Sequence, residues 1–247
     1  MLILLPPSES KRDGGSANSR LRLSTLGYPT LSAPRRQALK SLSALAKDFD
    51  EMGRALRLGP HQHDELVRNR RVARSPVLGA LHRYTGVLYE ALDASSLPEP
   101  ARRFAAQHLV IHSALFGLVR ADDPIPAYRL SSTSRLPGLS LRTLWSAPIE
   151  AALVNQPGLI LDARSESYTR LGPAPAGRSL FLRVVSEDGQ GRRKALNHFN
   201  KKGKGTFVRA LLRAGIDHAD AHSLLSWAAD VGIALSAPVP GELELVV

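Results

Sequence analysis

Apolar residues along this chain follow a strand-like period in some stretches and a helical period in others. Closely spaced apolar runs predict buried strands, and apolar positions three or four residues apart predict helices that present one face to a core. The predicted strands are Met1–Leu5, Leu109–Val119, Leu159–Ala163, Leu180–Val185, Lys194–Phe199 and Glu242–Val247. The predicted helices are Pro34–Phe49, Pro76–Leu92, Pro100–His108, Ser146–Val154, Thr206–Ala214 and Asp217–Asp230.

Local signals refine these elements. For Leu109–Val119 a strand competes with a continued helix, and Gly117 inside the run favours the strand. Ser146 followed by Pro148 is typical of a helix start, and Asp188-Gly189 is typical of the turn of a hairpin. Alternating residues in Glu242–Val247 predict an edge strand.

Strands interspersed with helices predict an α/β (α+β) fold, with a mixed β-sheet packed by helices. The chain has 247 residues, which is enough for a sizeable core, and it contains neither an internal repeat nor a low-complexity linker. We therefore expect a single domain over residues 1–247.

Composition limits the classes of function. No apolar run approaches the ~18 residues of a membrane span, and Met1–Leu5 lacks the basic region of a signal peptide, so we expect a cytoplasmic protein. The absence of cysteine excludes disulfides, thiolate metal sites and thiol nucleophiles. His108 and His112 are four residues apart, as are His218 and His222, but neither pair has the glutamate of a His-Glu-x-x-His zinc site. We expect neither a metal nor a cofactor.

Basic residues are distributed unevenly along the sequence. The net charge is +11, and the stretch from Arg178 to Arg213 holds ten Lys or Arg against two acids, whereas no Lys or Arg follows Ile216. GC-rich coding can explain scattered arginine, but four of the seven lysines lie between Lys194 and Lys204. Such clustering is typical of a nucleic-acid binder or of an enzyme for a phosphorylated substrate.

The centre of the basic stretch predicts a phosphate site. Glycines allow backbone N–H groups to converge, lysines add charge, and a helix starting behind Thr206 would offer its free N–H groups. The turn Gly203-Lys204-Gly205-Thr206 reverses the order of a Walker A motif, so that motif is excluded. The candidate phosphate-binding residues of this stretch are Arg192, Arg193, Lys194, Lys201, Lys202, Gly203, Lys204, Gly205, Thr206, Arg209 and Arg213.

A second phosphate candidate lies in RLPGLSLRTLW, from Arg135 to Trp145. Its Pro137-Gly138 step is similar to the turn of a helix-hairpin-helix element, in which glycine permits close approach to a DNA phosphate, with an ordinary turn as the alternative.

Several motifs together resemble the YaaA peroxide-stress family over nearly the whole chain. They are MLILLPP, YTGVLYEAL, LFGLVRADDPIPAYRL, LWSAPIEAAL, RSESY and KKGKG, in that order. The most specific matches are Arg120, Asp123, Tyr128, Arg129 and Leu130, which fit Arg-x-x-Asp-x-x-x-x-Tyr-Arg-Leu, and Lys201, Lys202 and Gly205 of a Lys-Lys-Ala-Arg-Gly segment. The chain departs from the family at Gly203-Lys204, at Glu166, which stands one place early, and in the loop from Ser8 to Lys11.

The resemblance implies a single-domain fold peculiar to the family, binding to double-stranded DNA, and protection against peroxide linked to lower free intracellular iron. Two functions compete on the residues. A basic cleft would hold duplex DNA through its backbone with little reading of sequence, and aromatic residues at 5% disfavour single-strand stacking. Alternatively, loops at strand ends would form an enzyme pocket for a nucleotide or another phosphorylated molecule. The pocket candidates are Ser8, Glu9, Lys11, Arg129, Ser165, Glu166, Tyr168 and Lys202.

We favour DNA binding and leave the oligomeric state open. An Arg129 side chain that meets Glu166 in the interior would favour either a structural ion pair or the pocket.

Overall fold

Strand β1 (Leu2–Leu5) lies at the centre of the main sheet, and all four of its side chains are buried. A strand covered on both faces needs apolar residues throughout, which explains the run that predicted it. The computed structural model that shows this arrangement describes residues 1–59, 62–188, 192–195 and 199–247. One cluster of buried apolar side chains extends through these residues from Met1 to Leu245.

The main sheet is mixed, with strand order β4-β3-β1-β6-β7-β10-β9. Strand β8 pairs with the C-terminal end of β7. Its other strands are β3 (Leu109–Ser113), β4 (Gly117–Arg120), β6 (Ile160–Asp162), β7 (Ser179–Glu187), β8 (Arg193–Ala195), β9 (Leu235–Ser236) and β10 (Glu242–Val246). A small antiparallel pair joins β2 (Leu78–Gly79) to β5 (Pro124–Ile125).

Five strands of the main sheet run parallel. β1 pairs in parallel with β3 and β6, β6 with β7, and β7 with β10, whereas β4, β8 and β9 are antiparallel to their neighbours. The carboxyl ends of β3, β1 and β6 therefore meet at one edge of the sheet, and the loops that follow these strands are brought together there.

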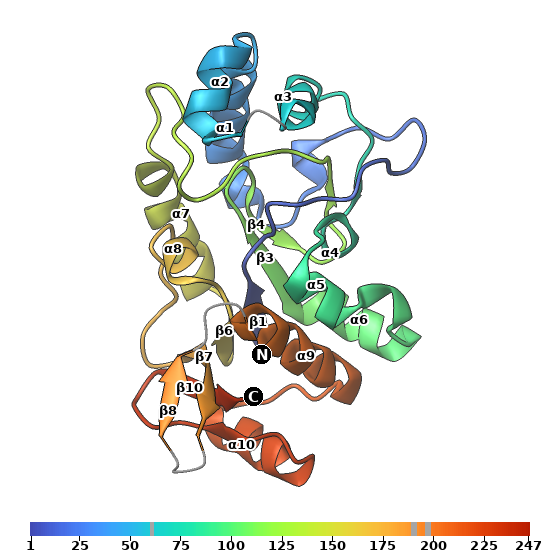
Figure 1. The fold of residues 1–247 in the computed structure, drawn as a ribbon. Helices are drawn as coiled ribbons and strands as arrows, with labels where there is room; N and C mark the ends of the chain where they lie inside the picture. Colours follow the sequence, from blue (N-terminus) through green and yellow to red (C-terminus); the bar gives the residue numbers. More distant parts are fainter. Residues whose placement is uncertain (60–61, 189–191, 196–198) are drawn as a thin grey trace.

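Helices cover both faces of the sheet. Helix α9 packs on α5, α6 and β7, while α7 packs against β4 and α1, and the α1–α3 group lies at the end of the molecule opposite α10 (Figure 1). The helices are α1 (Ser32–Leu45), α2 (Phe49–Leu56), α3 (His63–Arg70), α4 (Ala80–Arg83), α5 (Val87–Leu92), α6 (Glu99–His108), α7 (Leu141–Val154), α8 (Glu166–Thr169), α9 (Phe199–Ala214) and α10 (Ala221–Asp230). Short 3₁₀ turns lie at Leu23–Thr25, Pro29–Leu31 and Ala94–Ser96.

The expected mixed sheet packed by helices is confirmed, and three of the strand predictions need correction. Leu109–Val119 is two antiparallel strands, β3 and β4, because the chain turns back at residues 114–116 and Gly117 adopts φ +64°. The last strand, β10, is an interior strand between β7 and β9, although its alternating residues predicted an edge. The hairpin formed by β7 and β8 is confirmed, while Gly189 of its turn lies outside the described residues. Of the predicted strand Lys194–Phe199, the first two residues lie in β8, residues 196–198 lie outside the described residues, and Phe199 begins α9.

The predicted helices also need corrections. Pro76–Leu92 is the short strand β2 followed by helices α4 and α5, and the helix predicted from Asp217 begins at Ala221. Helix α7 begins at Leu141, where the Ser140 hydroxyl accepts a hydrogen bond from the Thr143 N–H, so Pro148 lies inside the helix rather than at its start. Helix α9 begins at Phe199, which places Gly203, Gly205 and Thr206 within the helix. The Gly203–Thr206 turn, and with it the phosphate site behind Thr206, is therefore absent.

Candidate functional site

The carboxyl ends of β1 and β6 lie at the point where the order of strands reverses, the position that we call the crevice of this open sheet by analogy with other α/β folds. The chain moves from β1 outward to β3 on one side and from β6 outward to β7 on the other. In open α/β sheets, ligands bind at such switch points, because the loops that follow the two neighbouring strands lead away from each other. Here the loops are Pro6–Lys11 after β1 and 163–168 after β6, which contain most of the pocket residues expected from the sequence.

Lys11 is the most unusual side chain of this crevice. It is 6% exposed, and its Nζ donates to the carbonyl oxygens of Ser8 at 2.8 Å and Glu9 at 3.2 Å. The ammonium also lies 4.2 Å from the centre of the Tyr128 ring, a favourable cation–π distance. Burial lowers the pKa of Lys11 to about 7, an effect that Glu65 opposes and Arg129 reinforces. The group can therefore gain or lose a proton near neutral pH.

A chain of hydroxyl groups lies behind Lys11. The Ser113 hydroxyl accepts hydrogen bonds from the N–H groups of Leu115 and Phe116, so its own proton is directed to the Tyr128 hydroxyl, 2.7 Å away. The Tyr128 hydroxyl in turn lies 2.8 Å from that of Tyr84. Burial raises the pKa of Tyr128 to about 12 and also raises the pKa of Tyr84, so both phenols stay protonated at neutral pH.

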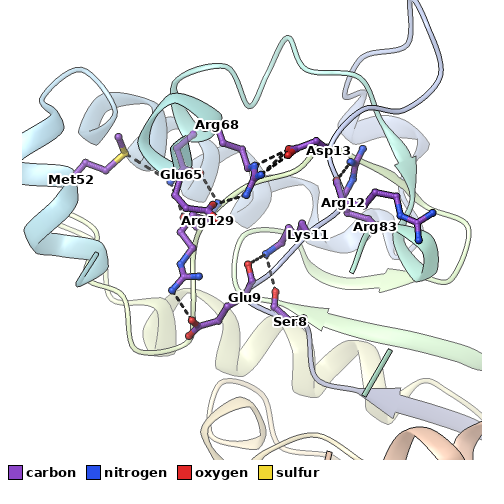
Figure 2. A network of polar contacts seen from close by, with 11 residues as sticks. Ser8, Glu9, Lys11, Arg12, Asp13, Met52, Glu65, Arg68, Arg83 and Arg129 are labelled. Atoms are coloured by element: carbon purple, nitrogen blue, oxygen red, sulfur yellow. Dashed lines mark hydrogen bonds and ion pairs between the residues drawn. The ribbon is translucent and has the colours of Figure 1, made fainter. Parts of the chain in front are cut away.

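Charged pairs cover the outer side of Lys11 (Figure 2). Arg129 donates to the Glu9 carboxylate at 2.5 Å, and the buried Asn69 side chain fixes the backbone of Arg129 by bonding both its N–H and its C=O. Beyond them, Arg68 bridges the carboxylates of Asp13 and Glu65. Arg129 therefore meets Glu9 and not Glu166, and the pair is open to solvent on the glutamate side, where the Glu9 side chain is 62% exposed.

The β6 side of the crevice is built on a buried ion pair. Arg164 binds the Asp162 carboxylate through two N–H groups, at 2.6 and 2.8 Å, and also donates to the ring of His112. Burial, and then the charge of Arg164, hold the pKa of His112 well below its ordinary value, so the ring is neutral. Lys204 of α9 donates to the Arg164 carbonyl at 3.1 Å, and burial lowers the pKa of Lys204 to about 8.

The remaining pocket candidates follow β6 or lie in α9. The Tyr168 ring is buried 5.4 Å from that of His112, and burial raises its pKa. Glu166 is exposed and reaches Arg183 at 3.4 Å, while the Ser165 hydroxyl bonds that of Ser167. The structure thus gathers Ser8, Glu9, Lys11 and Arg129 into one cluster, and it places Ser165, Glu166 and Lys202 outside that cluster.

Several basic residues of the expected phosphate site bind within the protein instead. Arg209 donates to the carbonyl oxygens of Leu92 and Asp93, Arg192 pairs with Asp188, and Arg193 pairs with Glu187 and Glu244. Gly205 faces α5 so closely that a Cβ there would lie 2.2 Å from the Leu88 carbonyl oxygen. Within the described part of the chain, the exposed members without an ion pair are Lys194, Lys201, Lys202 and Arg213.

The Pro137-Gly138 turn is exposed, and Gly138 adopts φ +66° between the bridged residues Leu136 and Leu139. It leads into α7, but the described chain from residue 126 to 140 contains no helix before it. A helix-hairpin-helix element needs a helix on each side, so of the two alternatives the ordinary turn is the one found. The histidine pairs also differ from a shared helix face: His108 ends α6 and His112 lies in β3, while His218 precedes α10 and His222 lies in it.

The sequence did not reveal two buried arginines that tie loops together. Arg83 and Arg35 are fully buried and bind backbone carbonyls of several loops, but nothing distinguishes them among 26 arginines. Asp162 could have been found, because a carboxylate at the end of the apolar run Leu159–Ala163 is costly to bury without a partner.

The comparisons agree with the resemblance found in the sequence. A sequence model of the family described as peroxide stress protein YaaA matches residues 1–229. A UPF0246 protein of Corynebacterium glutamicum is 39% identical over 238 residues, which cover 94% of each chain. A UPF0246 protein of Streptomyces coelicolor is 36% identical over 249 residues, covering 98% of this chain and 94% of the relative. The chain therefore belongs to the peroxide stress protein YaaA family.

Proposed function

We propose that this member of the peroxide stress protein YaaA family protects the cell by binding double-stranded DNA through its phosphates, without reading the sequence, and that this binding is linked to limiting free iron. The proposed site of action is the cytoplasm. As a separate finding, none of the described helices has the length and apolar character needed to cross a bilayer.

The observation that supports DNA binding is the pair Lys201 and Lys202 in the first turn of α9. Both are exposed and form no ion pair with a described residue. The first turn of a helix has unpaired N–H groups and a partial positive charge, so lysines there add to an existing attraction for anions. The phosphate site is thus proposed one turn earlier than the sequence predicted. The net charge of +11 would add long-range attraction to any polyanion.

Salt dependence tests this proposal. We would measure the affinity for two unrelated duplexes by fluorescence anisotropy between about 50 and 200 mM salt, because each phosphate contact contributes about 0.9 to the slope of log K against log salt. We expect a steep slope, similar affinities for the two duplexes, and a slope smaller by about 2 in the Lys201→Ala/Lys202→Ala variant.

The matched control is Lys40→Ala/Lys47→Ala, which removes the same charge from one exposed lysine in α1 and one just after it. It should lower affinity only slightly. A flat salt response would refute DNA binding through phosphates, and equal losses in the two double variants would assign the effect to net charge rather than to α9.

A second candidate function is binding or conversion of a nucleotide or another phosphorylated small molecule at the strand-end crevice. The observation that favours it is Lys11, a buried amine with a pKa of about 7 at the switch point of the sheet. Such an amine could act as a general base or acid near neutral pH, with Arg129 available for a phosphate once Glu9 moves aside.

Thermal shift measurements with adenine and guanine nucleotides test this second function. Stabilisation of the native protein that disappears in Lys11→Met would support it, provided that circular dichroism shows the variant to be folded. Because Lys201 and Lys202 lie outside the crevice cluster, their double variant should keep nucleotide binding and Lys11→Met should keep DNA binding. The two proposals therefore fail independently.

A further inference from the structure

A groove of about 1250 Å³ lies between α9, α10 and β10. No residue of the Lys11 cluster lines this α9–α10 groove. It exceeds the roughly 300–1000 Å³ of ordinary small-molecule pockets, so its size suits a larger occupant.

The floor of the groove is apolar. Phe207 and Trp227, whose ring centroids are 6.2 Å apart, line it together with Ala210 of α9. Val231 and Val247 line the margin with 52% and 54% of their surface exposed. Exposed valines next to a continuous apolar hollow are typical of a surface that another molecule covers.

The rim of the groove is positively charged. Lys202 and Arg213, both on α9, line it, are exposed, and form no ion pair with a described residue. None of the described residues that line the groove is an aspartate or a glutamate. An occupant must therefore combine an apolar face with negative charge on the side that faces α9.

The spacing of the two cations indicates how that charge is distributed. Lys202 and Arg213 are eleven residues apart on one helix, which corresponds to about 16 Å along the axis and to three turns plus about 20°. They therefore lie on the same edge of the groove, at its two ends. A ligand with one anionic head could reach only one of them, whereas a helix lying along α9 could pair with both.

We propose that the α9–α10 groove is the docking site for an acidic amphipathic helix of a partner protein. The helix spans at least three turns, places its apolar face on Phe207 and Trp227, and carries carboxylates about eleven residues apart that meet Lys202 and Arg213.

A synthetic peptide tests this docking directly. The probe is a fluorescein-labelled helical peptide of about 16 residues with leucines at helical spacing and glutamates eleven residues apart; its partner peptide has lysine at both glutamate positions. Anisotropy titrations without DNA give the affinities. We expect the glutamate peptide to bind native protein at least tenfold more tightly than the lysine peptide.

Charge reversal supplies the matched controls. Lys202→Glu/Arg213→Glu should weaken the glutamate peptide at least tenfold and should now prefer the lysine peptide, whereas Lys40→Glu/Lys47→Glu, with the same change of net charge, should keep the native preference. Circular dichroism verifies folding of each variant.

Equal binding of the two peptides, or an unchanged preference after charge reversal at the rim, overturns the proposal. So does saturable binding of dodecanoate by a protein that binds neither peptide, because the groove would then be a fatty-acid site. DNA affinity is measured separately, so failure of phosphate binding leaves this test unaffected.

Discussion

Substitution of Gly205 by alanine should destabilise the protein, although alanine is the better helix former. Within a helix, alanine is favoured over glycine by about 1 kcal/mol. At Gly205, however, the new Cβ would lie 2.2 Å from the Leu88 carbonyl oxygen and 2.9 Å from the Ala91 Cβ. The nearest atom belongs to the backbone of α5 and cannot rotate away, so the two helices must separate.

The size of the effect follows from these opposing contributions. Overpacking of a tight interior costs about 1–3 kcal/mol, and a clash with backbone belongs at the upper end of that range. After the gain in helix preference, we expect a net loss of about 2 kcal/mol in the free energy of unfolding. For a chain of this size, that corresponds to a Tm lower by about 4–8 °C.

Gly53 provides the matched control. It also lies inside a helix, α2, at a position where a Cβ would meet no atom within 4 Å. Gly53→Ala should therefore raise the unfolding free energy by up to about 1 kcal/mol. Urea denaturation followed by circular dichroism measures both variants. If Gly205→Ala proves as stable as the native protein, the close packing of α9 on α5 is wrong, and the glycine would again be available for an anion-binding role.

Three further predictions concern the crevice. Between pH 7 and pH 10.5, Lys11 binds fewer protons in the folded protein than in the unfolded chain, because its pKa is lowered on folding. The free energy of unfolding of the native protein should therefore rise with pH across that window relative to the Lys11→Met variant. Parallel pH profiles of the two proteins would contradict the lowered pKa. Asp162→Asn leaves the buried Arg164 without its counter-ion and should cost about 3–5 kcal/mol in urea denaturation. Glu166→Gln removes an exposed ion pair and should change the free energy of unfolding by less than about 0.5 kcal/mol. A loss as large as that of Asp162→Asn would show that solvent exposure does not determine how much these ion pairs contribute to stability.

The sheet was predictable because its signals are local. A buried parallel strand needs an apolar run whatever surrounds it, so β1 and β6 could be found from the sequence, as could the hairpin of β7 and β8. The position of β10 was not predictable, because alternation of polar and apolar residues does not reveal whether the outer neighbour is solvent or a two-residue strand such as β9.

Part of the candidate site was predictable for the same reason. Lys11 and Glu9 follow β1 directly, and the rule that ligand loops follow strands was enough to select them. The partner of Arg129 was not predictable, because it depends on Asn69, which is distant in sequence and fixes the path of the irregular segment before α7. Gly205 was misread because a glycine next to a lysine cluster suits both an anion-binding loop and a close helix contact, and only the position of Leu88 distinguishes the two.

The segment Lys201–Gly205, little more than one helical turn long, contains both solvent-facing and interior positions. Lys201 and Lys202 face solvent, whereas the Lys204 ammonium lies in the interior against the Arg164 carbonyl and the ring of Phe181. Replacing all three lysines at once would therefore mix a loss of surface charge with damage to the interior. If every amino acid were placed at each position and the cellular abundance of the protein were measured, most substitutions at positions 201 and 202 should leave the abundance unchanged. Nearly all substitutions at positions 204 and 205 should lower it.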